Sequence, residues 1–384
     1  MKSTENKVYF PGLDGMRLIS CVSIILVHID AVKLEMGVPV LKWTYYYNKI
    51  GVLSVSLFFV LSGFLISYLL LQEKQNTGTI NMKGYYIRRI LRIWPLYFAV
   101  IFMGFFVWPH ISDFFMKNYL NHVGQSWWLT LLGCMLFLPA TLFTINDLPD
   151  PLRASWTVRV EEVFYFFWPH LVKRTKNFIR TCLWIIIGTV VIRGISFYIL
   201  NNYFRNSYGY VLLLGPSSII MDYRISCMAI GGIGAYLIVV KDNKIIPFLY
   251  RKDVQFITYT LTVIALIAEV HIPFIHHEIF SALFTIIIMN LGNNPECIIN
   301  LDYKWMNYFG KRTYGLYLYH LLMVLLWVNF VKQHTPQFGV WQMNIIIYAG
   351  TLLSTAAAAI ISYQFLEKPF LKLKRRHTVI ETRE

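Results

Sequence analysis

Residues 13–30 read LDGMRLISCVSIILVHID, an apolar run that carries Arg17 near its start and His28 near its end. An α-helix rises ~1.5 Å per residue, so about 20 apolar residues cross the hydrocarbon core of a bilayer. This run is predicted to be the first membrane-spanning helix. Polar side chains at such depth are costly, which makes an ionisable group inside a span a candidate functional residue. His28 is the first such candidate.

The composition places the whole chain in a membrane. Its 384 residues are 57% hydrophobic and only 14% charged, with a mean hydropathy of +0.52, outside the range of soluble domains. Backbone hydrogen bonds inside lipid must close within each segment, so the predicted fold class is an all-α integral membrane protein. The apolar segments expected to be helical are 18–32, 51–71, 94–109, 127–145, 156–172, 178–200, 211–240, 254–268, 273–291, 313–331 and 341–366.

Clusters of Lys and Arg mark the cytoplasmic loops of membrane proteins. If segment 127–145 spanned the bilayer, the basic cluster at 173–176 would lie outside the cell. We therefore expect 127–145 to be re-entrant or interfacial, which leaves about ten spanning helices and both termini in the cytoplasm. The clusters that this topology places inside are Lys74 with Lys83, Arg88, Arg89 and Arg92; Lys173, Arg174 and Lys176; Lys241 and Lys244; Lys311 and Arg312; and Lys372, Lys374, Arg375 and Arg376.

The chain is expected to form one membrane domain, residues 1–384, with a core at about 8–372 and a short basic tail at 373–384. The net charge of +15 comes from short loops beside apolar helices, where anionic headgroups attract it, so no nucleic acid partner is expected. The five cysteines show no paired spacing, and no metal site or redox role is predicted. The segment AVKLEMG after the first helix has no small-residue cleavage site, so that helix is expected to be retained.

Arg17 and His28 lie on one face of the first helix. They are 11 residues apart, which is about three turns, so they differ by roughly 20° around the axis and by ~16 Å along it. With Arg17 at the cytoplasmic boundary, His28 is expected near mid-bilayer. Two interpretations stay open: a buried imidazole hydrogen-bonded to a neighbouring helix, or a general base, a role that suits neutral histidine. Asp14 is expected to cap the helix, and Asp30 to be a polar residue near its outer end.

Three arginines, Arg88, Arg89 and Arg92, lie at the mouth of the third predicted helix, in YYIRRILRIWPLYF at 85–98. They can simply anchor the helix on the cytoplasmic side. Alternatively, they form a clamp for phosphate oxygens, because residues three and four apart share a helix face and guanidinium groups match phosphate geometry. Such a clamp would suit a pyrophosphate-bearing cofactor that arrives from the cytoplasm.

Two further stretches contain polar residues at membrane depth. GVLSVSLFFVLSGFLIS at 51–67 has Ser62 beside a glycine, where a small residue permits close approach of a helix or a ligand. GKRTYGLYLYHLLMV at 310–324 supplies Tyr314 and His320. For Ser62 simple helix packing is the alternative, and for His320 a hydrogen bond to a neighbouring hydroxyl group.

A pair of glutamates lies in ASWTVRVEEVFYFFWPHLV at 154–172, a stretch that also contains Trp156. Neighbouring positions on a helix point ~100° apart, so at most one of Glu161 and Glu162 faces a shared cavity. A solvated helix end explains one of them. It does not explain both, because their neighbours are apolar and charge at this depth is expensive.

Taken together, these motifs resemble the acyltransferase 3 family of polytopic membrane acyltransferases. LDGMRLISCVSIILVH resembles the family's first-helix motif of a basic residue, ten others and a histidine, here Arg17 and His28. The other motifs follow in the family's order over about residues 8–372: SLFFVLSGFLIS, the Arg89 and Arg92 pair in RRILRIWPLYF, SWTVRVEEVFYFFWP, MDYRISCMAIGGIGAY, TYGLYLYH and LEKPF.

The chain departs from its presumed family at one motif. Many relatives read LWSLSVEEQFY, where this chain has Thr157, Arg159 and Val163, so an acceptor contact through those positions is not carried over. We also expect no fused extracellular esterase-like domain. We therefore expect the acyl group to reach its acceptor directly from the membrane domain.

The resemblance implies transfer of an acyl group, usually acetyl, from cytoplasmic acyl-coenzyme A to a hydroxyl group of an extracytoplasmic or lipid-linked glycan. It also implies a multi-pass protein of the bacterial plasma (inner) membrane, with acyl-coenzyme A as co-substrate and no metal. The acceptor, the acyl chain and the oligomeric state stay open, a homodimer being one arrangement.

Roles follow for the candidate residues. The arginines at 88–92 would hold the phosphates of coenzyme A, together with Arg17. His28 would act as base or transient acyl carrier, and Glu161 or Glu162 would orient its imidazole or bind the acceptor. The residues expected to line the substrate cavity are Ser62, Trp156, Tyr314 and His320.

The alternative function is a proton-coupled transporter or a flippase of sugar–lipid intermediates, in which His28, Glu161 and His320 would relay protons. Such folds often show repeated halves and pairs of helices interrupted by Gly or Pro. Neither pattern is visible in the sequence, and phosphate binding explains the arginine cluster at 88–92 better.

Overall fold

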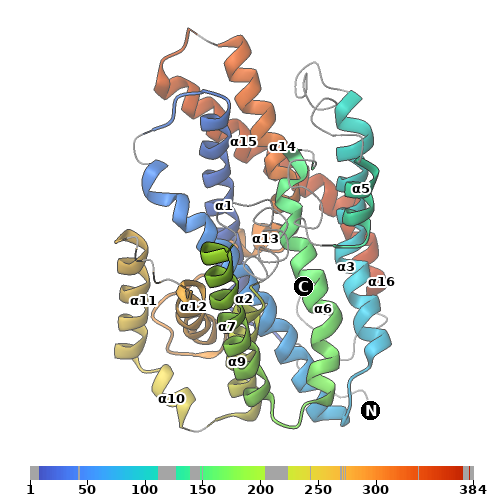
Figure 1. Ribbon diagram of the computed structural model, residues 1–384, viewed down its shortest axis with the longest axis vertical. Coiled ribbons are helices and arrows are strands. Elements are labelled where there is room, and N and C mark those ends of the chain that lie inside the picture. Colours follow the sequence, from blue (N-terminus) through green and yellow to red (C-terminus); the bar gives the residue numbers. More distant parts are fainter. Residues whose placement is uncertain are drawn as a thin grey trace.

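The computed structural model describes residues 8–41, 44–110, 127–138, 148, 150–203, 224–242, 244–268, 270, 272, 274–335, 337–374 and 380. Within these residues the chain is helical and has no β-strand (Figure 1). The α-helices are α1 (Leu13–Glu35), α2 (Thr44–Thr77), α3 (Met82–Phe102), α5 (Trp127–Met135), α6 (Trp156–Arg174), α7 (Phe178–Tyr203), α9 (Ile225–Val240), α10 (Ile245–Leu249), α11 (Lys252–Ile267), α12 (His276–Asn293), α13 (Lys304–Gly310), α14 (Thr313–His334), α15 (Val340–Ser362) and α16 (Lys368–Lys374). Short 3-10 or π segments are η1 (Met103–Val107), η2 (Trp108–His110), η5 (Asp150–Ser155) and η6 (Tyr363–Glu367).

In the described part of the chain, six helical runs are long and apolar enough to cross a membrane. They are Leu13–Glu35, Ile50–Thr77, Met82–Val107, Phe178–Ile199, Thr313–His334 and Val340–Lys374. The other predicted spans fall on α6, α9, α11 and α12, which are shorter or more polar. The all-helical membrane class is therefore confirmed, whereas the total of ten spans and the side of each terminus stay predictions.

Segment 127–145, which was predicted not to span, contains the short helix α5. Its nine residues extend ~13 Å, less than half of a hydrocarbon core of about 30 Å. A helix of this length cannot cross the bilayer alone, and the re-entrant or interfacial placement of segment 127–145 stays a prediction. Residues 139–145 lie outside the described part of the chain.

Helix α2 packs against α9 backbone to backbone. A Cβ atom at Gly63 would collide with the backbone of Met228, and one at Gly231 would collide with the carbonyl group of Val60. Small residues let membrane helices approach this closely. The glycine beside Ser62 therefore serves a helix contact, and it fixes α2 in the position from which Ser62 reaches its own partners.

Helix α1 runs beside α14 and α15 in the upper part of Figure 1. Asp30 and Lys33 form an ion pair of 2.8 Å in which both side chains are fully buried. Tyr348 of α15 donates a hydrogen bond of 2.6 Å to Asp30, and Lys33 donates to Asn344. Asp30 is thus a structural residue that ties α1 to α15, and this tie sets the position of α1 near His28.

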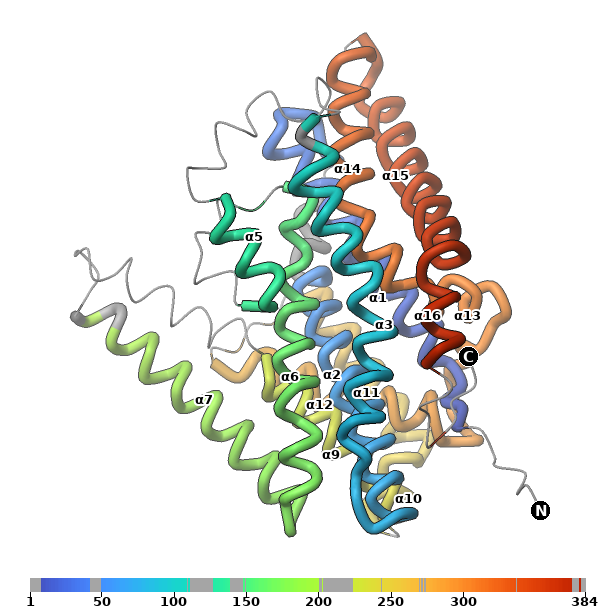
Figure 2. Tube along the Cα trace, turned by 90° about the vertical axis from the view of Figure 1, so that its right-hand side faces the viewer, coloured from blue at the N-terminus to red at the C-terminus, as the bar shows by residue number. Residues whose placement is uncertain are grey.

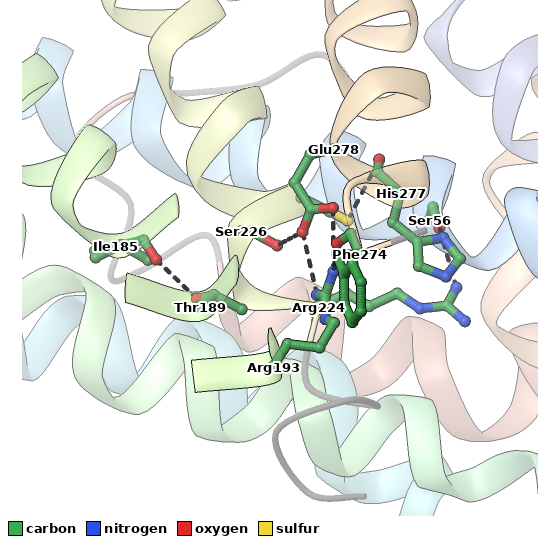
Figure 3. Close-up of polar contacts among 10 residues, drawn as sticks. Ser56, Ile185, Thr189, Arg193, Arg224, Ser226, Phe274, His277 and Glu278 are labelled. Atoms are coloured by element: carbon green, nitrogen blue, oxygen red, sulfur yellow. Dashed lines mark hydrogen bonds and ion pairs between the residues drawn. The ribbon is translucent and has the colours of Figure 1, made fainter. Parts of the chain in front are cut away.

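A second buried ion pair holds α7, which lies at the edge of the bundle (Figure 2) with only 11% of its apolar span buried inside the protein. Arg193 of α7 lies 3.1 Å from a carboxylate oxygen of Glu278 on α12, and Ser226 of α9 donates a hydrogen bond of 2.7 Å to the same carboxylate (Figure 3). Next to them, Arg224 donates to Ser56 of α2 at 3.0 Å. These contacts connect a lipid-facing helix to the packed core.

The basic residues around the α2–α3 turn and those at the C-terminal end of α6 lie at one end of the bundle. Lys74, at the end of α2, donates to the carbonyl oxygen of Val172 at 2.8 Å and to that of Thr175 at 3.2 Å, so it covers the C-terminal end of α6. The α2–α3 turn and α10 lie at the same lower end in Figure 1. The side of the membrane on which this end lies stays a prediction.

Candidate active site

A cavity of about 310 Å³ lies between α1, α2, α3, α6, α14 and the C-terminal segment formed by η6 and α16. Its lining includes seven of the predicted site residues, Arg17, Ser62, Arg88, Arg89, Arg92, Glu161 and Tyr314. The predicted residues His28, Glu162, Trp156 and His320 are not part of the lining. The tertiary structure thus collects residues from five helices around one space.

Arg17 enters the cavity from the first turns of α1. It forms an ion pair of 2.7 Å with Asp14, three residues before it. The prediction that Asp14 caps the helix is wrong, because the N-cap is Gly12 and its left-handed backbone starts the helix without a side-chain cap. Asp14 instead partners Arg17 at the cavity wall.

The three arginines of α3 differ in their partners. Arg88 forms an ion pair of 3.4 Å with Glu73. The guanidinium of Arg89 lies over the ring of Tyr165, 5.3 Å from its centroid, and its Nε atom has no hydrogen-bond partner. Among the described residues, no carboxylate lies within ion-pair distance of Arg89 or Arg92. The cavity wall therefore holds two guanidinium groups that form no ion pair with a described carboxylate.

Glu161 faces the cavity from α6 and is held by two hydroxyl groups. Ser62 of α2 donates a hydrogen bond of 2.8 Å to one carboxylate oxygen, and Tyr165 donates one of 3.1 Å to the other. The Tyr165 hydroxyl also lies 3.1 Å from the hydroxyl of Ser62. Ser62, Glu161 and Tyr165 form a closed polar triangle in the wall of an otherwise apolar helix interface.

Glu162 bonds to a different neighbour, because adjacent positions on a helix point ~100° apart. Its Oε2 atom accepts a hydrogen bond of 3.1 Å from the indole of Trp94, while its Oε1 atom is buried without a hydrogen-bond partner. Trp156 packs its ring edge to face against Phe59, with centroids 6.4 Å apart. Neither Glu162 nor Trp156 lines the cavity.

His28 of α1 and His320 of α14 contact each other directly. Nδ1 of His28 lies 2.9 Å from Nε2 of His320, and the rings are stacked with their centroids 5.0 Å apart. His320 is fully buried. The sequence identified both histidines but not this contact. In this structure the imidazole of His28 contacts His320, whereas Glu161 bonds to Ser62 and Glu162 to Trp94.

Tyr317 connects the histidine pair to the cavity. It lines the cavity, and its ring centroid lies 5.3 Å from that of His320. Its hydroxyl donates a hydrogen bond of 3.1 Å to the carbonyl of Ala154 and accepts one of 2.9 Å from Thr157. Thr157, one of the departures from the family motif, thus supports the wall next to the histidines.

Several residues of the lining were not predicted. Glu367, in the motif LEKPF, lines the cavity together with Lys311 and Lys374. It lies in the π-helical turn η6, a local distortion that often accompanies functional sites. The sequence signal that could have identified Glu367 is a carboxylate directly after the apolar segment 341–366. The π turn that directs this side chain inward leaves no pattern in the sequence.

Tyr9, which precedes α1, also lines the cavity. Its hydroxyl bonds to the carboxylate of Asp302 and accepts a hydrogen bond of 3.3 Å from Asn307. Burial, together with the neighbouring Asp302 carboxylate, raises the pKa of Tyr9 to about 12. The phenol therefore stays neutral and attaches the chain before α1 to α13.

Arg159, the second departure from the family motif, is buried in α6 with only 2% of its surface exposed. It donates a hydrogen bond of 3.2 Å to the carbonyl of Leu138, and its Nε and Nη2 atoms have no hydrogen-bond partner. It does not line the cavity. Within the described ranges, no group of three His, Cys, Asp or Glu side chains is placed to hold a metal ion.

Known proteins resemble this chain over most of its length. The family model described as an acyltransferase domain matches residues 10–364. The peptidoglycan O-acetyltransferase OatA of Listeria monocytogenes is 25% identical over 393 residues, which cover 97% of this chain and 58% of the relative. The putative peptidoglycan O-acetyltransferase YrhL of Bacillus subtilis is 25% identical over 95% of this chain and 55% of the relative.

The O-acetyltransferase OatA of Staphylococcus aureus is likewise 25% identical, over 95% of this chain and 57% of the relative. The chain therefore spans little more than half the length of these curated relatives. No solved structure shows a significant match.

Proposed function

The chain belongs to the acyltransferase family whose model it matches, and we propose that it moves an acyl group, most simply acetyl, from acyl-coenzyme A to a hydroxyl group of a cell-envelope glycan. Its relatives are named for acetyl transfer, two of them on peptidoglycan. One observation carries the proposal. The same cavity has two unpaired guanidinium groups in its wall, and its residue Tyr317 packs against the His28–His320 pair.

Cations are concentrated at the donor end of the cavity, whose lining also contains the carboxylates of Asp14 and Glu367. Arg89 and Arg92 have no carboxylate partner among the described residues, and Arg17, Lys311 and Lys374 line the same space. Guanidinium groups bind phosphate oxygens through charge-assisted, paired hydrogen bonds. Coenzyme A carries a pyrophosphate at the end of its pantetheine arm, so a thioester anchored at this end would extend its acyl group into the bundle.

The chemistry requires one base and one proton donor. The acceptor hydroxyl attacks the thioester carbonyl carbon while Nε2 of His28 takes the hydroxyl proton. The tetrahedral adduct then breaks its C–S bond, an ester forms on the acceptor, and the departing sulfur receives the proton from the His28 imidazolium. Coenzyme A leaves as the free thiol and His28 returns to its neutral form. In a variant of this route His28 carries the acyl group transiently.

Glu161 is the proposed contact for the acceptor. Its two oxygens each accept one hydrogen bond, from Ser62 and Tyr165, and a carboxylate has about four lone-pair sites. The remaining sites can accept hydrogen bonds from sugar hydroxyl groups in the cavity. The Ser62 and Tyr165 hydroxyls hold the carboxylate in one orientation, which an acceptor site needs in order to present a single hydroxyl to the base.

Inverted membrane vesicles test this function, because their outer surface corresponds to the cytoplasmic side. Vesicles that contain the protein receive radiolabelled acetyl-coenzyme A and a membrane fraction rich in peptidoglycan precursors. The wild type is expected to release coenzyme A thiol and to label glycan, whereas the His28→Ala protein should do neither. His334→Ala, at the exposed outer end of α14, is the matched control and should retain transfer.

The same vesicle experiment distinguishes an acyltransferase from a transporter or flippase. A transporter would move protons or translocate a labelled glycan lipid and leave the acetyl-coenzyme A intact. Full transfer activity in the His28→Ala protein, at equal expression, would overturn the proposed role of this residue.

A further inference from the structure

The two histidines form a chain of contacts that ends at a backbone carbonyl. Nδ1 of His28 lies 2.9 Å from Nε2 of His320, and Nδ1 of His320 contacts the carbonyl oxygen of Tyr317. His320 is fully buried, and no carboxylate among the described residues bonds to either ring. Three of the four ring nitrogens therefore have one identified neighbour each, and Nε2 of His28 has none among the described residues.

The carbonyl oxygen determines where the protons are. It can only accept, so Nδ1 of His320 carries a hydrogen and donates it to Tyr317. In the neutral ring Nε2 of His320 then has a lone pair, which accepts from Nδ1–H of His28. A neutral His28 with its hydrogen on Nδ1 has its own lone pair on Nε2. Among the described residues nothing bonds to that Nε2 atom.

We infer that His320 is a positioning residue that holds His28 in the Nδ1–H tautomer and thereby makes Nε2 of His28 the atom that accepts the acceptor's proton. The inference rests on the proposed acyl transfer. His320 does not touch the substrate in this scheme, and its own Nε2 is occupied by His28. The arrangement uses a neutral imidazole for the orienting task that a carboxylate performs in the Ser-His-Asp triad.

The helices that carry both rings are anchored by further contacts. Tyr317, whose carbonyl fixes His320, is itself anchored through its hydroxyl to Thr157 and Ala154. The buried pair of Asp30 and Lys33 lies two and five residues after His28 on the same helix and ties it to α15. The distance between the two rings is therefore set by packed helices on both sides.

The neutral partner also has a chemical consequence. When Nε2 of His28 takes a proton, the imidazolium keeps its Nδ1–H bond to His320 and the positive charge stays between two rings. A carboxylate partner would stabilise that charge more strongly and slow the return of the proton to the departing sulfur. A neutral acceptor orients the base while leaving it able to give the proton back.

Two variants separate orientation from simple packing. His320→Gln keeps an acceptor oxygen near the position of Nε2, whereas His320→Phe keeps the ring and removes the acceptor. We expect His320→Phe to lower kcat for acetyl transfer by about 10²-fold or more, the usual scale of a general-base contribution. The KM for acetyl-coenzyme A should stay within about threefold, since the donor site is distant. His320→Gln should recover at least about tenfold of the lost kcat.

Solid-state ¹⁵N NMR of histidine-labelled protein in liposomes measures the tautomer directly, with the His28 signals assigned by difference from the His28→Ala protein. The wild type should show a protonated Nδ1 and an unprotonated Nε2 at His28, and His320→Phe should show a mixture of tautomers. A wild-type His28 protonated on Nε2 would overturn the inference, even if neither His320 variant folds. Equal kcat in both His320 variants would overturn it as well.

The failure of the proposed function gives a different result. If His28→Ala transfers acetyl groups normally, the function of His28 is wrong and the tautomer has no catalytic meaning. If His28→Ala is inactive while the His320→Phe protein is fully active, the base stands and only the positioning role fails.

Discussion

Ser62 of α2 donates a hydrogen bond of 2.8 Å to Glu161 of α6, a residue 99 positions further along the chain. The two neighbouring glutamates of α6 lie in different surroundings, because Glu162 bonds to Trp94 and does not line the cavity. Of the two adjacent glutamates, Glu161 lines the cavity and Glu162 lies on another face of the helix.

Replacing Glu161 with Gln should lower kcat/KM for the acceptor by about 10²-fold, because a neutral amide loses charge-assisted bonds worth about 1.5–3 kcal/mol each. Acetyl transfer in vesicles measures this at fixed donor concentration. Glu162→Gln is the matched control and should change little, since its amide oxygen can still accept from Trp94. A larger loss in Glu162→Gln than in Glu161→Gln would contradict the assignment.

Replacing Arg92 with Gln should raise the KM for acetyl-coenzyme A by about tenfold or more, because one charge-assisted phosphate contact is lost. Steady-state kinetics with acetyl-pantetheine, which has no phosphates, provides the decisive comparison. The variant and the wild type should use this truncated donor equally well. Arg153→Gln, in an exposed ion pair with Glu35, should leave both donors unaffected. An equal loss with both donors would mean that Arg92 does not bind phosphate.

Removing one side of the Arg193–Glu278 pair should destabilise the protein by about 3–5 kcal/mol, because the remaining buried charge has lost its partner. The Arg193→Leu protein is therefore expected to unfold at a clearly lower temperature in detergent. The double variant with Leu at both positions should regain most of the loss. The exposed pair of Arg251 and Asp253 provides the control, and Arg251→Ala should unfold like the wild type. Additive losses in the double variant would show that the two charges do not depend on each other.

Gly63→Val should prevent correct packing of α2 on α9, at a cost of at least about 3 kcal/mol, since its Cβ would collide with the backbone of Met228. Size-exclusion chromatography and thermal unfolding of the purified protein report the loss. Gly188→Val is the matched control, because nothing lies within 4 Å of a Cβ at that position of α7. A Gly63→Val protein that unfolds at the wild-type temperature would rule out the close contact.

The sequence supplied most of the candidate residues but not their partners. Seven of the predicted site residues line one cavity, because the Arg, Ser, Glu and Tyr side chains were chosen as polar groups inside apolar helices, and such groups require an interior space. Neither glutamate bonds to His28 in the structure. The ring that contacts His28 belongs to α14, 292 residues further along the chain.

The sequence by itself determined that the chain lies in a membrane, that it is helical, and that Arg17 and His28 share one face of the first helix. The physical reason is local: lipid forces each backbone segment to satisfy its own hydrogen bonds, and the helix repeat then fixes which side chains share a face. Only the tertiary structure decided that His28 meets His320, that Glu161 and not Glu162 enters the cavity, and that Arg88 is paired while Arg89 and Arg92 have no carboxylate partner among the described residues. Those facts depend on how helices rotate and approach one another, which close packing between distant segments sets and no local pattern encodes.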